Sequence, residues 1–122
     1  MGKRFLFLTI CSIFLISNLP NLYGQTGKTY KVGISVWTGY PTSVKGFKEA
    51  MNAGGLVEGK NVKYLYGKSG LEREKQYEIA RGFKKEQVDL VYSLTTPGTT
   101  IIKEIMPHTT PIVFSIVTYP RM

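Results

Sequence analysis

Four short apolar runs alternate with three amphipathic segments, and this alternation restricts the fold more than any other feature of the sequence. Each run has the length of a strand and is rich in β-branched or aromatic residues. The runs cover residues 31–37, 61–66, 88–93 and 111–117, and the segments, with apolar residues at helical spacing, cover 42–53, 71–87 and 97–106. Strands and helices in this order build a parallel sheet through right-handed crossovers. We therefore predict an α/β fold, a doubly wound parallel sheet of four strands and three helices.

The run at residues 88–93 is short and β-rich, which is typical of a strand buried on both faces. The residues after it predict a helix start, with Thr96 as N-cap and Pro97 at the first helical position. The run at 61–66 differs, because Val62 and Tyr64 alternate with Lys63. We expect that strand to lie nearer an edge of the sheet, and residues 67–70 to form a turn.

Residues 1–24 have the outline of a secretory signal peptide. Lys3 and Arg4 supply a positive start, an apolar stretch covers residues 5–16, and cleavage is expected after Gly24. That stretch is shorter than the roughly 20 residues of a membrane-spanning helix, although an uncleaved anchor stays an alternative. A lipoprotein signal is rejected, because Ile10 is too large for the position before Cys11. We expect an exported protein, periplasmic or extracellular, with one domain at residues 25–122.

The exported chain would have neither a thiol nor a disulfide, because Cys11 is the only cysteine and would leave with the signal peptide. Losing Lys3 and Arg4 also lowers the net charge from +8 to +6. The remaining excess of basic residues is spread along the sequence, whereas a nucleic-acid surface needs a basic patch interleaved with aromatic residues. We therefore expect a solvated basic surface and no nucleic-acid partner.

The sequence offers little for catalysis or for a metal. His108 is the only histidine, and without cysteine a zinc site of usual composition cannot form. Seven of the eight acidic residues fall in helices or connectors where exposure to solvent explains them, and Asp89 stands at the amino end of a buried strand. Residues 67–70 lack the spacing of a phosphate-binding P-loop, and residues 38–43 match a flavin phosphate loop only loosely. We expect no enzyme, no metal and no cofactor.

Polar side chains gather where the predicted strands end, and in a parallel sheet these ends share one edge, where ligands bind. The candidates for ligand binding are Ser35, Trp37, Thr38, Thr95, Thr96, Ser115 and Thr118. A ligand carboxylate can accept hydrogen bonds from the N–H groups at residues 96–99, at the positive end of the helix dipole. Trp37 or Tyr119 can cover an apolar or aromatic ligand. The alternative for Thr95 and Thr96 is that they only cap the helix.

The sequence ends directly after the fourth predicted strand, at Met122. A strand of this kind normally leads into a further helix, which covers the open face of the sheet. We therefore expect these residues to be the front part of a longer protein.

Six segments of the chain follow one familiar order and spacing, at residues 31–35, 45–50, 57–62, 88–91, 95–97 and 111–118. The connector Val-Glu-Gly-Lys-Asn-Val at 57–62 and the strand Pro-Ile-Val-Phe-Ser at 111–115 are the most specific. Over residues 30–120 the chain resembles the ABC-transporter substrate-binding proteins of the group that includes tryptophan- and tyrosine-type uptake proteins. One departure is that the family usually has Asp-Pro where this chain has Tyr119 and Pro120.

The resemblance implies a periplasmic-binding-protein fold of type I, with two lobes, of which this chain supplies most of the first. It implies a non-catalytic solute-binding component of an ABC importer, with a small solute such as an amino acid as ligand and a membrane permease as partner. The cleft role carries over to the turn after the first strand, to Thr95 and Thr96, and to residues 115–118, while the missing second lobe supplies the other contacts. An exported sensing domain with the same lobe fold is the alternative, and a flavodoxin-like enzyme is a third.

Overall fold

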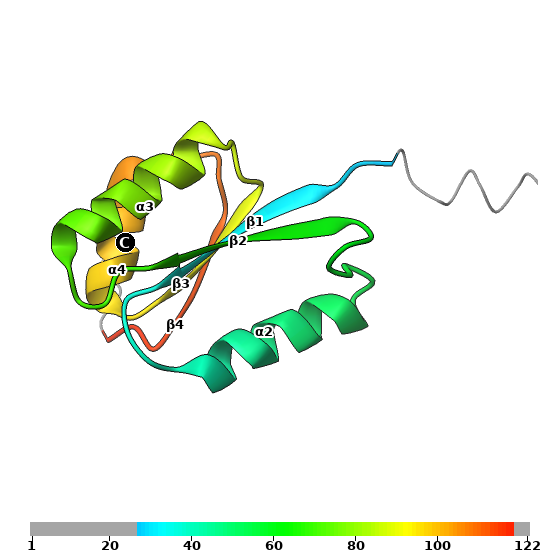
Figure 1. The fold of residues 1–122 in the computed structure, drawn as a ribbon, viewed down its shortest axis with the longest axis horizontal. Helices are drawn as coiled ribbons and strands as arrows, with labels where there is room; N and C mark the ends of the chain where they lie inside the picture. Colours follow the sequence, from blue (N-terminus) through cyan, green and yellow to red (C-terminus); the bar gives the residue numbers. More distant parts are fainter. Residues whose placement is uncertain (1–26, 119–122) are drawn as a thin grey trace, which may run out of the picture.

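The computed structural model describes residues 27–118, in which four strands alternate with three helices (Figure 1). In chain order the elements are β1 (Tyr30–Val36), α2 (Pro41–Ala53), β2 (Val62–Lys68), α3 (Arg73–Lys85), β3 (Leu90–Leu94), α4 (Thr96–Ile105) and β4 (Ile112–Ser115). The predicted order of strands and helices is confirmed. The predicted signal peptide and Tyr119 lie outside the described residues.

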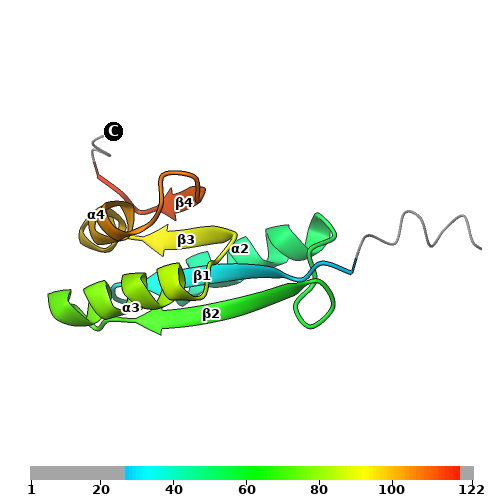
Figure 2. The ribbon, with the colours of Figure 1, turned by 90° about the horizontal axis from the view of Figure 1, so that it is seen from above.

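The four strands are parallel and lie in the order β2-β1-β3-β4. β1 is central, and its ladder with β3 ends at the pair Ser35–Ser93. Helix α2 covers one face of the sheet, and α3 and α4 cover the other (Figure 2). This arrangement is the doubly wound parallel sheet that the sequence predicts. It places the carboxyl ends of all four strands along one edge.

Each face of the sheet has its own apolar core, because successive side chains of a strand point to opposite faces. Under α3 and α4 the core residues are Ala80, Phe83, Val88, Val91, Ile101, Ile102 and Met106. Under α2 they are Val32, Ile34, Val62, Tyr64, Tyr92 and Leu94. Helix α2 buries no residue fully, and the Phe47 ring stacks on Tyr92 with 4.1 Å between centroids. The face under α3 and α4 is thus the more completely covered one.

Left-handed residues decide where several elements begin or end. Helix α3 begins two residues later than predicted, because Leu71 has a φ of 73°, which a right-handed helix cannot contain. Strand β4 ends just before Ile116, which has a φ of 58°. Helix α4 begins at Thr96, directly after Thr95 at a φ of 70°, and no side chain caps it. The prediction of Thr96 as N-cap is therefore wrong by one position.

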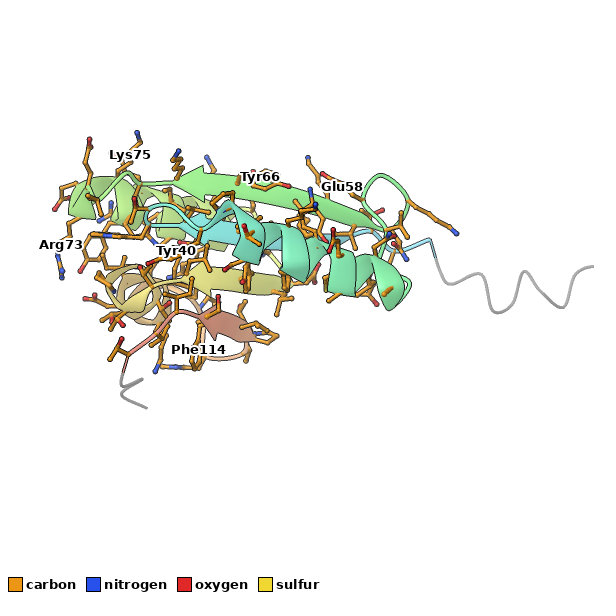
Figure 3. All side chains as sticks on the ribbon, turned by 90° about the horizontal axis from the view of Figure 1, so that it is seen from below. Tyr40, Glu58, Tyr66, Arg73, Lys75 and Phe114 are labelled. Carbon is orange, nitrogen blue, oxygen red and sulfur yellow. The ribbon has the colours of Figure 1, made fainter. Side chains whose placement is uncertain are left out.

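Strands β2 and β4 form the two edges of the sheet. The edge position predicted for β2 is confirmed, but the strand continues through Gly67 and Lys68, where the sequence predicts a turn. On β4, Val113 and Phe114 are 45% and 44% exposed, and Phe114 lies on the opposite edge of the sheet from Tyr66 of β2 (Figure 3). One edge of the sheet therefore exposes apolar side chains.

Across residues 27–118, none of the helices has the length and apolar character needed to cross a membrane.

Candidate functional site

The loops that follow the four strands share an unusual backbone feature. Among residues 27–118, five residues other than glycine have a positive φ, and four of these lie in the loops after the strands. They are Tyr40 after β1, Leu71 after β2, Thr95 after β3 and Ile116 after β4. Such conformations cost about 1–3 kcal/mol each and cluster at functional sites. We call these four loops, together with the first turn of α4, the rim.

Buried polar side chains gather in the rim and directly beneath it. In the part of the chain that the structure describes, they are Ser35, Ser69, Gln76, Ser93 and Thr99. Ser93 Oγ and Thr99 Oγ1 share a hydrogen bond of 2.9 Å, and Gln76 Nε2 donates to Ser35 Oγ at 2.6 Å. Buried polar groups are costly unless they are hydrogen-bonded, so a layer of them at one end of the sheet indicates a functional edge.

Hydrogen bonds join the rim loops in two pairs. The loops after β1 and β2 are joined by Ser69 N–H to Val36 O at 3.0 Å and by Leu71 N–H to Trp37 O at 3.1 Å. The loops after β3 and β4 are joined by Thr95 N–H, which donates to a carbonyl oxygen of the β4 end at 3.1 Å. The rim therefore consists of a β1/β2 half and a β3/β4 half.

Three of the predicted ligand residues stand in the β1/β2 half. Ser35 is fully buried beneath the rim and held by Gln76, so its hydroxyl does not face the open edge. Trp37 and Thr38 are half-buried in the loop after β1, and Trp37 packs against the core under α3 and α4. A direct ligand contact from this half therefore falls to Trp37 and Thr38, which stays a prediction.

The other four predicted residues lie together in the β3/β4 half. Thr118 N–H donates to Thr96 Oγ1 at 2.9 Å, and Thr95 N–H donates to Ser115 O at 3.1 Å. The Ser115 hydroxyl shares a hydrogen bond of 2.9 Å with the Tyr92 hydroxyl. Thr96 and Thr118 are thus held next to each other at the open edge, whereas the Ser115 hydroxyl is turned toward the face under α2.

The first turn of α4 presents backbone N–H groups at the rim. Thr99 N–H donates to Thr95 O at 3.1 Å, and Pro97 has no N–H. The N–H groups of Thr96 and Gly98 donate to no other residue between 27 and 118. Because the positive end of the helix dipole lies at the same place, this turn is suited to an anionic group such as a carboxylate.

Four residues in the rim or directly beneath it are missed when the sequence is read for polar candidates alone. Gln76 stands four residues before Ala80 and seven before Phe83, so helical spacing places it on the buried face of α3. Tyr40, Leu71 and Ile116 give no signal, because nothing in their sequence context marks a left-handed residue other than glycine. Their side chains are 45%, 62% and 41% exposed, so the rim also presents apolar surface.

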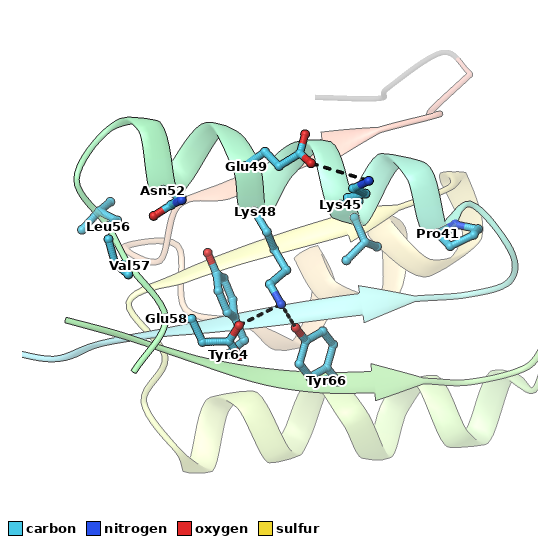
Figure 4. A pocket seen from close by; sticks show the side chains of 11 residues that line it. Pro41, Lys45, Lys48, Glu49, Asn52, Leu56, Val57, Glu58, Tyr64 and Tyr66 are labelled. Atoms are coloured by element: carbon cyan, nitrogen blue, oxygen red, sulfur yellow. Dashed lines mark hydrogen bonds and ion pairs between the residues drawn. The ribbon is translucent and has the colours of Figure 1, made fainter. Parts of the chain in front are cut away.

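A hollow of about 490 Å³ lies away from the rim, between α2 and β2 (Figure 4). Lys48 Nζ donates to the Tyr66 hydroxyl at 2.6 Å and lies 2.9 Å from a Glu58 oxygen. These two contacts raise the pKa of Lys48, and burial raises the pKa of Tyr64 beside it. Lys45 and Glu49, which also line the hollow, pair with each other at 3.8 Å. Because its charges are already paired, this hollow offers a ligand less than the rim does.

The histidine and the acidic residues have ordinary places. No group of three or more His, Cys, Asp or Glu side chains within residues 27–118 could hold a metal ion. His108 is exposed in the loop before β4. Asp89 accepts a hydrogen bond from Lys31 N–H at 2.9 Å and pairs with Lys28 at 3.4 Å. Asp89 therefore ties the amino ends of β1 and β3 together, at the end of the sheet opposite the rim.

Thr95→Gly should stabilise the fold, because glycine adopts the backbone conformation of Thr95, with φ 70° and ψ 157°, without strain. We expect the free energy of unfolding to rise by about 0.5–2 kcal/mol, the relieved strain less the larger entropy of an unfolded glycine. Urea unfolding measures this change. Thr100→Gly, an ordinary exposed position in α4, is the control and should lower stability. Equal losses in both variants would show that Thr95 is not strained.

Comparison with known proteins adds to this geometry. A family model described as ABC transporter substrate binding protein matches residues 31–121. No curated protein gives a significant match to the chain. The resemblance drawn from the sequence, over the amino-terminal part of such a protein, is thereby confirmed.

Three solved structures share the fold. A conserved domain protein from Vibrio cholerae is 31% identical, with a TM-score of 0.70 over 76% of this chain. The ligand-free, open structure of CD0873, a substrate-binding protein with adhesive properties from Clostridium difficile, is 22% identical, with a TM-score of 0.71 over 75%. An ABC domain in complex with L-Trp, from Streptococcus pneumonia, is 19% identical, with a TM-score of 0.67 over 76%. This chain spans about a third, 32%, of the length of each of them.

Proposed function

We propose, from the premise that this chain belongs to the ABC-transporter substrate-binding protein family, that it binds a small solute such as an amino acid for an importer. Proteins of this family bind substrates, are normally not enzymes, and are periplasmic or extracellular. In our proposal the rim is one wall of the binding cleft, and the permease of the importer is the partner that receives the solute.

The first turn of α4 carries this proposal. It combines two N–H groups that donate to no described residue, the positive end of a helix dipole, and the strained residue Thr95. Thr118 lies exposed beside this turn, because its backbone N–H and carbonyl oxygen both pair with the Thr96 hydroxyl. This set of donors suits the carboxylate of an amino acid, and the exposed side chains of Tyr40 and Leu71 suit an apolar portion of the ligand.

We further propose that a second lobe completes the cleft. Two observations support this: the chain spans 32% of the solved structures that it resembles, and the β4 edge exposes Val113, Phe114 and Ile116. An exposed apolar face of this kind usually marks a surface that another element covers. Reading the DNA downstream of codon 122 tests the idea, because a continuing frame with a second α/β lobe is expected. A transmembrane helix followed by a kinase or cyclase region would instead favour a sensor.

Residues 1–24 are, in this proposal, a signal peptide that exports the protein. Amino-terminal sequencing of the protein from the cell exterior or periplasm should start at Gln25. If the protein is recovered only in the membrane fraction and begins at Met1, residues 1–24 are an uncleaved anchor and not a signal peptide.

The ligand is tested by a thermal-shift panel of the twenty amino acids on the full-length gene product. We expect aromatic or other apolar amino acids to raise the melting temperature. At a ligand concentration of about 100 Kd the stabilisation should be ~2.7 kcal/mol. Nucleotides and sugars serve as controls of other chemical classes. A shift with a nucleotide or a sugar, and none with any amino acid, would contradict the proposed solute class.

A further inference from the structure

Gln76 joins α3 to two parts of the rim. It is fully buried in the first turn of α3. Its Nε2 donates to Ser35 Oγ at 2.6 Å and to the carbonyl oxygen of Gly98 at 3.2 Å. Ser35 ends the ladder between β1 and β3, and Gly98 belongs to the first turn of α4. One side chain therefore connects the end of β1 with the amino end of α4.

This connection lies just where the hydrogen-bonded pairing of β1 with β3 ends. The ladder between β1 and β3 ends at the pair Ser35–Ser93, and beyond it the loop hydrogen bonds join β1 to β2 and β3 to β4. The Gln76 amide thus bridges the β1/β2 half and the β3/β4 half of the rim. It does so directly beneath the N–H groups that the proposed function gives to the ligand.

The first turn of α4 is enclosed by side chains from both halves. A Cβ atom at Gly98 would lie 3.4 Å from Gln76 Nε2, 3.4 Å from Trp37 Cβ and 3.7 Å from Thr95 Oγ1. The turn therefore packs against Gln76, Trp37 and Thr95. A substitution at Gln76 therefore alters direct contacts of the turn that carries the Thr96 and Gly98 N–H groups.

The chemistry of Gln76 is unfavourable for a residue that only fills the core. Among the described residues, the buried side-chain atoms without a hydrogen-bond partner are Gln76 Oε1 and Thr95 Oγ1. Both residues lie against Gly98 in the first turn of α4. An unpaired buried acceptor is costly, so an apolar side chain of the same length would serve mere packing better. The two hydrogen bonds that Nε2 donates explain why a polar residue stands here, because they link α4 to β1.

We infer that Gln76 is a positioning residue for ligand binding: it holds the first turn of α4 so that its N–H groups point at the ligand's carboxylate. The inference rests on the proposed function for the identity of the ligand. It does not rest on it for the structural effect, which can be measured without any ligand.

Gln76→Met keeps the length of the side chain and removes its hydrogen bonds, and two readouts separate positioning from general stability. The first is amide hydrogen exchange of the full-length protein without ligand. Exchange at Thr99, whose N–H donates to Thr95 O at the amino end of α4, should accelerate about three- to tenfold, the range that one lost hydrogen bond gives, while β2 and the middle of α3 keep their rates. The second is calorimetric binding of L-Trp and of L-tryptophanamide, in which an uncharged amide replaces the carboxylate.

Gln76→Met should weaken L-Trp binding about tenfold and leave L-tryptophanamide binding unchanged, so the preference for the carboxylate falls by the same factor. Tyr77→Phe is the matched control, because it removes another α3–α4 hydrogen bond, from the Tyr77 hydroxyl to Glu104 Oε2 at 2.9 Å, away from the rim. It should change neither readout. Ser35→Ala removes only the β1 end of the bridge and should give a smaller effect of the same direction, which covers the case that Gln76→Met fails to fold.

The outcomes are distinguishable. If exchange at Thr99 stays at the native rate in both Gln76→Met and Ser35→Ala, Gln76 does not position α4 and the inference is lost. Equal losses of L-Trp and L-tryptophanamide binding would also overturn it, because they indicate general damage to the site. If the native protein binds no amino acid while exchange at Thr99 accelerates in Gln76→Met as expected, the proposed function fails and the structural role of Gln76 stands.

Discussion

Gly67→Ala should lower the free energy of unfolding by about 1–3 kcal/mol, the usual cost of forcing an extra carbon into a packed interface. Gly67 lies in β2 beneath α3, and a Cβ atom there would clash with Ile79 Cγ2 and stand 2.9 Å from Ile79 Cγ1. Such contacts cannot form unless the Ile79 side chain leaves its rotamer or α3 moves away from the sheet. Urea unfolding followed by circular dichroism measures the loss.

Gly82→Ala is the control for this substitution, because Gly82 lies on α3 with no atom within 4 Å of its Cβ position. Alanine is the better helix former, so the control should raise stability by roughly 0.8–1 kcal/mol. A Gly67→Ala protein as stable as the native one would mean that α3 does not approach β2 as closely as the structure shows. The opposite signs of the two substitutions make this test robust to general effects of adding a methyl group.

Gly67 also shows why the sequence predicts the order of elements better than their ends. A Gly-Lys-Ser-Gly segment has the composition of a turn, yet its first two residues extend β2, because α3 packs so closely that only glycine fits. Gly67 and Ile79 belong to different elements, so the composition of the short segment around Gly67 cannot reveal their contact. The alternation of Val62, Lys63 and Tyr64, by contrast, reflects one face of one strand, and the edge position that it predicts is confirmed.

The candidate site was predictable in position and only partly in composition. Parallel strands place their carboxyl ends together, so the sequence leads to Thr95, Thr96 and Thr118, and the structure holds these residues at one end of the rim. Ser35 illustrates the limit, because a strand residue one position from the end can point beneath the rim as well as into it. Gln76 gives no such signal, because helical spacing places it on the buried face of α3, where an apolar residue is expected, whereas its contribution there is a hydrogen bond.

Ile101→Ala should have the largest effect on stability, about 2–5 kcal/mol, because Ile101 is fully buried in the core under α3 and α4. A domain of ordinary stability has only about 5–15 kcal/mol to lose, so this change alone can leave a large unfolded fraction. Urea unfolding measures it, and Ile105→Ala, at a partly buried position of the same helix, should cost clearly less. Similar losses at both positions would contradict the burial of Ile101.

Helix α4 combines a structural role in the core with a proposed role in ligand binding. Its middle, with Met106 directly after its end, anchors the core through Ile101 and Ile102, and its first turn presents N–H groups at the rim. The buried residues of α4 hold the helix in place, and the first turn keeps its position because it is continuous with them. Ile101→Ala should therefore reduce ligand affinity only in proportion to the unfolded fraction, whereas Gln76→Met should reduce it in the folded protein. Binding measured against folded fraction separates the two.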